Sequence, residues 1–123
     1  MQLYNDFFEI IEKNECDFLI KLNKNHFVYC AHFPKNPITP GVLLVQMVVE
    51  LLEMLTACKL LLKKIKNLKF IAVINPEVVE NVRFTFTKIE KAGNDCNVVV
   101  EIHNEQQQFA KMSANVLMVN ISE

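Results

Sequence analysis

The sequence has no excess of charge of either sign. Its 13 lysine and arginine residues nearly balance 14 aspartate and glutamate residues, which leaves a formal net charge of −1. Domains that bind nucleic acid or anionic membranes usually carry a basic surplus. The composition therefore gives no support to either class of partner, and we expect neither.

The sequence also lacks paired cysteines. Its four cysteines are far apart and form no Cys-x-x-Cys pair: Cys16, Cys30, Cys58 and Cys96. Zinc sites and disulfide frameworks need closely patterned cysteines. We therefore predict no metal site, no disulfide framework and a reducing, cytoplasmic location.

Neither a targeting segment nor a membrane span is predicted. Residues 1–13 carry acids among apolar residues and have no basic beginning, which is not typical of a signal peptide. The apolar stretch 42–62 is interrupted by charged side chains, among them Glu50 and Lys59, which are costly in a bilayer. Repeats, linkers and low-complexity segments are also missing, so we predict one domain over residues 1–123.

Glycine and proline are scarce, and most of them fall in one stretch. Three of the four prolines and one of the two glycines lie within residues 32–42, HFPKNPITPGV. Proline fixes φ at about −65° and disfavours a helix at the preceding residue, so this stretch is predicted to be a stiff, extended loop. It ends in Pro40-Gly41, a pair typical of a turn or of the start of a helix.

Hydrophobic periodicity predicts the other elements. Residues 42–62 are predicted to form one long, mostly buried helix with a basic exit over residues 63–67, and residues 4–12 a short amphipathic helix. A helix of about 20 residues is about 30 Å long, so a sheet must wrap around it. The predicted class is α+β, with a curved antiparallel sheet around one central helix. Strands are predicted over residues 17–22, 26–30, 68–74, 82–89, 96–103 and 108–119, with a hairpin turn at 92–95.

Three histidines are candidates for proton transfer near neutral pH. His26, at the start of a predicted strand, and His103, beside a polar turn, are interpreted as structural or surface residues. His32 lies in the proline loop, which provides the fixed placement that a general base needs. The amides of Gly41 and Val42 would be the first of the helix and would polarise a carbonyl oxygen, as in an oxyanion hole. The alternative is that Gly41 only eases a tight turn.

The motif HFPxxPxxPGV before a long apolar helix resembles the β-hydroxyacyl-acyl-carrier-protein dehydratases, which have the hotdog fold. The resemblance implies that His32 removes a proton from C2 of a 3-hydroxyacyl thioester and that the amide of Gly41 binds the thioester carbonyl. It implies no metal or organic cofactor. The residues at the family's spacing are His32, Phe33, Pro34, Pro37, Ile38, Pro40, Gly41, Val42 and Leu43.

The resemblance also implies partners. A homodimer or a trimer of dimers is expected, with active sites shared between protomers and acyl tunnels at their interface. The substrate is expected on the phosphopantetheine arm of an acyl carrier protein, or as the acyl-CoA thioester. Phe33 and Tyr29, an aromatic residue where the family usually has one, join Gly41 and Val42 as expected substrate-binding residues.

The sequence departs from that family at the catalytic acid. The family's Glu or Asp falls fourteen residues after the histidine, where this chain has Gln46, and an amide is no useful acid at pH 7. Four residues on, where many relatives carry glutamine, this chain has Glu50. Positions i and i+4 share a helix face, about 6 Å apart along the axis. Gln46 and Glu50 are both catalytic candidates for binding the leaving hydroxyl or its water; the alternative is an ordinary polar stripe.

The sequence leaves three functions open. The first is a 3-hydroxyacyl thioester dehydratase, and the second a non-catalytic, acyl-binding partner subunit, which the glutamine at position 46 favours. The third is a hotdog acyl thioesterase, for which Glu50 is the only obvious carboxylate. Lys63, Lys64 and Lys66 are candidates for docking an acidic carrier protein, although a solvated helix end would look the same.

Overall fold

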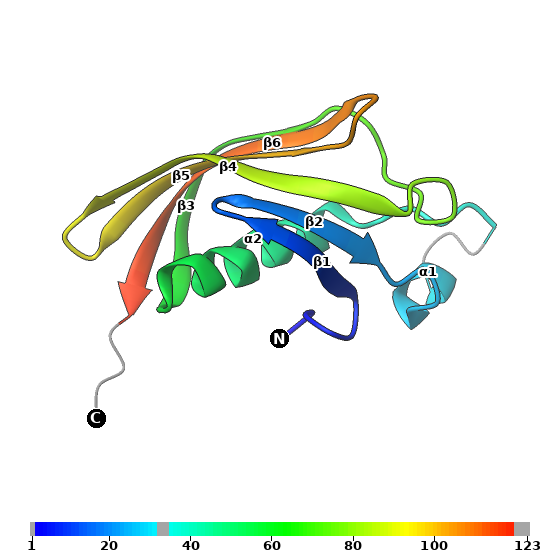
Figure 1. Cartoon of the computed structure of the whole chain (residues 1–123), viewed down its shortest axis with the longest axis horizontal. Coiled ribbons are helices and arrows are strands. Elements are labelled where there is room, and N and C mark those ends of the chain that lie inside the picture. The colour runs from blue at the N-terminus through cyan, green and yellow to red at the C-terminus, as the bar shows by residue number, and fades with distance from the viewer. Residues whose placement is uncertain (1, 32–34, 120–123) are drawn as a thin grey trace.

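The computed structural model describes residues 2–31 and 35–119, and within them six strands form one antiparallel sheet. The sheet order is β1-β2-β4-β5-β6-β3, so that β1 and β3 are its edges. Figure 1 shows the sheet curving over the long helix α2, with the short helix α1 beyond the end of β2. The strands are β1 Phe8–Asn14, β2 Asp17–Leu22, β3 Lys59–Phe70, β4 Asn81–Ala92, β5 Asp95–His103 and β6 Gln108–Val119.

Helix α2, Gly41–Thr56, fills the concave side of the sheet. Its apolar side chains recur at helical spacing and turn one broad face toward the strands. This packing confirms the α+β class and the curved sheet around a central helix. The buried apolar residues of the helix are Leu43, Leu44, Met47, Val48, Leu51 and Leu52.

The alternating strands agree with the sequence prediction. In β4, Val82, Phe84 and Phe86 are buried while their neighbours are more exposed, as period two requires. The predicted hairpin at 92–95 joins β4 to β5, and Gly93 takes φ 64° in it. Glycine adopts this left-handed conformation without steric cost.

The predicted helix over residues 4–12 is wrong. Residues 3–8 form a turn in which the Leu3 carbonyl accepts the amides of Asp6 at 3.1 Å and Phe7 at 2.7 Å. The chain then enters β1, which pairs with β2 from Phe8 opposite Leu22 onward. Apolar spacing over nine residues fits a helix, but long-range strand pairing determines the structure here.

The predicted strand over residues 26–30 is also wrong. Residues Phe27–Ala31 form helix α1, a single turn that directly precedes the proline loop. Nδ1 of the His26 ring accepts a hydrogen bond from the Val28 amide (3.2 Å). The backbone carbonyl of His26 accepts one from the Tyr29 amide (3.1 Å). Aromatic and β-branched residues favour strands, but capping by His26 turns this segment into a helix.

The long helix ends six residues before the predicted end. Ala57 takes φ 55°, which reverses the chain after Thr56. Leu60 then donates its amide to Glu53 Oε2 at 3.0 Å, which holds the start of β3 beside the helix. The apolar run continues across this reversal, so periodicity alone could not detect it.

The predicted basic helix exit lies in strand β3 instead. Lys63, Lys64 and Lys66 belong to the edge strand β3, which pairs with β6. The strand predicted over 68–74 is the end of β3, which stops at Phe70. None of the described helices is both long and apolar enough to span a membrane.

Candidate active site

The second half of the proline loop is anchored by Thr39. Its amide donates to the Ile74 carbonyl at 2.9 Å, and its hydroxyl lies 2.9 Å from the buried Tyr29 hydroxyl. Burial raises the pKa of the Tyr29 phenol, more than the hydrogen bond to Thr39 lowers it, so this hydroxyl stays protonated at neutral pH. Tyr29 also stacks on Phe7, with ring centroids 5.6 Å apart. The structure thus joins Tyr29 to Thr39, near the end of the loop, and the role of Tyr29 in substrate binding stays a prediction.

The first half of the loop falls partly outside the described residues. His32, Phe33 and Pro34 belong to this part, so the roles predicted for His32 and Phe33 stay predictions. The described neighbours on either side are Ala31, the last residue of α1, and Lys35.

Gly41 and Val42 begin helix α2 and carry its first amides. The Pro40 carbonyl accepts the amides of Leu43 at 3.0 Å and Leu44 at 3.3 Å. The Gly41 and Val42 amides therefore lie at the positive end of the helix, ahead of its first internal hydrogen bonds. This is the chemistry that an oxyanion needs.

The ring of Phe70 lies close to the glycine that begins the helix. A Cβ added to Gly41 would lie 2.5 Å from Cζ of Phe70, closer than real contacts allow. Both residues line a mostly apolar cavity of about 330 Å³ together with Ile38, Leu44 and Val73. The helix start thus lies beside a cavity that suits an apolar ligand.

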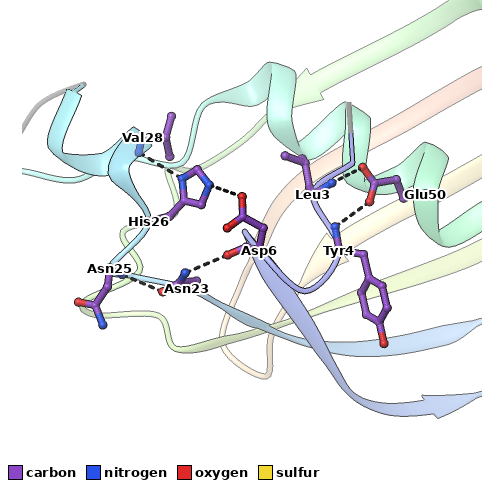
Figure 2. A network of polar contacts seen from close by, with 8 residues as sticks. All are labelled: Leu3, Tyr4, Asp6, Asn23, Asn25, His26, Val28 and Glu50. Atoms are coloured by element: carbon purple, nitrogen blue, oxygen red, sulfur yellow. Dashed lines mark hydrogen bonds and ion pairs between the residues drawn. The ribbon is translucent and has the colours of Figure 1, made fainter.

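Gln46 and Glu50 lie one turn apart on α2 and contact each other. Gln46 Nε2 donates to Glu50 Oε2 at 2.9 Å. Glu50 is 7% exposed and also accepts the backbone amides of Leu3, at 2.7 Å, and Tyr4, at 2.9 Å (Figure 2). The sequence predicted the proximity of the pair, but gave no sign that a distant backbone segment binds the carboxylate.

A groove of about 660 Å³ runs beside this pair. It lies between α2, the start of β3 and residues 2 and 4, and both Val42 and Gln46 line it. The structure thus brings Gly41, Val42, Gln46 and Glu50 onto one helix, with three of these four along the groove.

The lysines predicted for carrier docking are separated from this helix start. Lys63 forms an ion pair with Asp95 at 3.3 Å, and Lys66 donates to Asn97 at 2.8 Å, both toward β5. They therefore lie over the sheet, and docking there stays a prediction. Among residues 2–31 and 35–119, no three metal-ligating side chains cluster.

His103 belongs to a polar cluster on the outer side of the sheet. Its Nε2 lies 2.8 Å from the Thr85 hydroxyl, which donates to Asp17, and Asp17 also pairs with Arg83. These side chains alternate with inward-facing apolar ones, so they point away from α2. His103 is therefore separate from the candidate site.

The family model described as ApeI-like, ApeI dehydratase, matches residues 9–113. No curated protein sequence matches the chain.

Several solved structures have the same hotdog fold. The dehydratase heterocomplex ApeI:P from Xenorhabdus doucetiae is 16% identical, with a TM-score of 0.60 over 89% of this chain and 93% of that one. A variant of the thioesterase enzyme SAV0944 from Staphylococcus aureus subsp. aureus Mu50 is 14% identical, with a TM-score of 0.66 over 92% and 93%. A hypothetical thioesterase with coenzyme A from Streptococcus pneumoniae TIGR4 is 9% identical, with a TM-score of 0.62 over 92% and 86%.

At sequence identities this low, the structural likeness shows the fold alone. The family model shows kinship, because it covers most of the chain. The hotdog fold expected from the proline motif is confirmed. The protein belongs to the ApeI-like dehydratase family and has the hotdog fold.

Proposed function

We propose that the protein is a dehydratase that eliminates water from 3-hydroxyacyl thioesters presented by an acyl carrier protein. One observation carries the proposal: α2 begins at Gly41 with two amides ahead of its internal hydrogen bonds, beside an apolar cavity. This arrangement suits the oxygen of a thioester carbonyl. Membership of a dehydratase family favours the elimination of water as the reaction.

In the proposed mechanism, His32 removes the proton at C2 while the Gly41 and Val42 amides bind the thioester oxygen. Negative charge gathers on this oxygen as the C2–H bond breaks, and the helix start stabilises it. The bond from C3 to its hydroxyl then breaks, protonated His32 returns the proton taken from C2 to the leaving oxygen, and water leaves. Gln46, which lines the groove, binds the leaving hydroxyl or its water. The site is shared within a homodimer, so that His32 of one protomer works with Gln46 of the other, and no cofactor takes part.

The products of an acyl-thioester panel test this proposal. We expect 3-hydroxyacyl thioesters to give the enoyl thioester, the reverse hydration to occur as well, and no free acid to be released. Absorbance of the enoyl thioester and chromatography of the free acid separate these outcomes. Release of free acid alone would show a thioesterase. If no chain length reacts on either carrier protein or coenzyme A, the proposal of an enzyme fails.

A second candidate function is that of a partner subunit for an active dehydratase. The glutamine at position 46 favours it, because the dehydratases this chain resembles have an acid there. The solved relative from Xenorhabdus doucetiae is a dehydratase heterocomplex, which shows that a member of this fold can work in a mixed assembly.

Replacing Gln46 by glutamate distinguishes the two functions. In our proposal Gln46→Glu gives no gain, and we expect a loss of kcat of about 10-fold, because a second carboxylate would lie where Gln46 now donates to buried Glu50. The double variant Gln46→Glu/Glu50→Gln is the matched control, since it removes this repulsion and restores the family's order. A large gain in kcat for the double variant would indicate a degenerate site and favour the partner subunit.

A further inference from the structure

Glu50 is the only buried carboxylate of the described core, and its three hydrogen-bond partners among the described residues are all donors. Oε2 accepts from Gln46 and from the Leu3 amide, while Oε1 accepts from the Tyr4 amide. A buried charge is tolerated when donors compensate it in this way. A carboxylate whose two oxygens both accept hydrogen bonds is suited to hold a segment in place. A catalytic acid would instead need an acceptor beside it to receive its proton.

The anchored segment is the 3–8 turn, whose other end contacts the region before α1 (Figure 2). Asp6 Oδ2 lies 3.1 Å from His26 Nε2, and the Asp6 carbonyl accepts Asn23 Nδ2 at 2.9 Å. The Phe7 carbonyl accepts the Asn23 amide at 2.9 Å. One short turn therefore bonds to α2 on one side and to residues 23–26 on the other.

His26 links the 3–8 turn to α1. Because Nδ1 accepts a hydrogen bond from the Val28 amide at 3.2 Å, the ring proton is on Nε2. This N–H donates a hydrogen bond to Asp6. The His26 ring stacks on Phe27 with centroids 4.7 Å apart and meets Phe7 edge-on at 5.2 Å. The ring is thus held in one orientation from three sides.

The contacts form a closed circuit that runs from α2 through the 3–8 turn and α1 back to the start of α2. Glu50 holds the 3–8 turn, the turn holds His26 and α1, and Tyr29 of α1 bonds to Thr39, just before α2 begins. In the sequence, α1 immediately precedes residue 32 and Thr39 lies two residues before Gly41. The circuit fixes α1 and the start of α2, which lie on either side of the loop that contains His32, the proposed base.

We propose that Glu50 is a positioning residue, which fastens the 3–8 turn to α2 and thereby holds α1 and the start of α2 in register. It binds no substrate and delivers no proton. The catalytic consequence rests on the proposed function, whereas the mechanical coupling between Glu50 and His26 does not.

The coupling is tested by hydrogen exchange in variants of exposed Asp6, which is 73% accessible, so that its loss leaves the core intact. Asp6→Ala removes the acceptor of His26. We expect exchange of the Val28 amide to rise about 10-fold, and exchange of the Leu3 and Tyr4 amides to rise with it. Asp6→Asn keeps an acceptor oxygen and should restore exchange to near the wild-type rate. A rise at Val28 alone would overturn the proposal.

The role of Glu50 is tested by Glu50→Gln beside Glu53→Gln. Glu53 is a matched control, because it also lies on α2 and accepts a backbone amide, that of Leu60 on β3. We expect Glu50→Gln to speed exchange at Leu3, Tyr4 and Val28 about 10-fold, and Glu53→Gln to leave these three amides unchanged.

Kinetics separate positioning from acid catalysis. We expect Glu50→Gln to lower kcat for dehydration about 10-fold, to leave KM within about twofold, and to keep every ionisation of the wild-type pH profile. Loss of one ionisation from that profile would show that Glu50 is the acid and would overturn the proposal. If the wild type dehydrates nothing, the proposed function fails, and the exchange measurements still decide the coupling.

Discussion

Replacing His32 by alanine is expected to lower kcat for dehydration by about 10²- to 10⁴-fold, the largest effect that we predict for one side chain. The methyl group cannot accept the C2 proton, and no other histidine can take its place. His26 Nδ1 is bound to the Val28 amide, and His103 bonds to Thr85 on the outer side of the sheet. Stopped assays of enoyl thioester formation, with the melting temperature measured in parallel, check this result.

His103→Ala is the matched control for that experiment. It removes an imidazole of the same size from a cluster that faces away from α2, so kcat should stay within about twofold of the wild type. Wild-type activity in His32→Ala would refute His32 as the base. Equal losses in both variants would point to a general effect on stability instead.

The sequence was most informative where residue types themselves determine the backbone. The alternation of residues 82–89 predicted β4, and the Pro40-Gly41 pair indicated the start of α2, which was predicted at Val42 and begins at Gly41. Prediction failed where a distant segment decides the structure. Residues 8–12 became part of β1 because β2 is available as a partner, and the leucines after Thr56 continue into β3 because β6 pairs with them.

In the candidate site, too, features set by residue type were predicted, whereas contacts with distant segments were not. The Pro40-Gly41 pair predicted a helix start beside Gly41, and the spacing of Gln46 and Glu50 predicted that they share a helix face. The partners of Glu50 could not be predicted, because they are backbone amides of Leu3 and Tyr4, and a backbone amide carries no residue identity. The contact of Phe70 with Gly41 was equally hidden, since it joins residues 29 positions apart across the sheet and helix.

Replacing Gly41 by alanine is expected to lower the free energy of unfolding by at most about 1 kcal/mol, although alanine normally favours a helix, because it displaces the half-exposed ring of Phe70. The added Cβ would lie 2.5 Å from Cζ of Phe70, so the ring must leave its place. Gly41 has no positive φ, and its backbone conformation therefore suits alanine. Without the ring, the same substitution should stabilise the protein by about 0.4–1 kcal/mol. Urea unfolding of Gly41→Ala in the wild-type and Phe70→Ala backgrounds measures this change of sign.

Activity separates the two reasons for this glycine. In the Phe70→Ala background the alanine at position 41 fits the fold, yet its methyl group still lies beside the amides proposed to bind the thioester oxygen. We therefore expect kcat/KM to fall roughly 10²-fold when Gly41→Ala is added to Phe70→Ala, even though the protein gains stability. If activity returns with stability, Gly41 serves only the contact with Phe70, and the oxyanion site must lie elsewhere. A stable but slow double variant would instead support close approach of the substrate to the start of α2 as the reason for glycine.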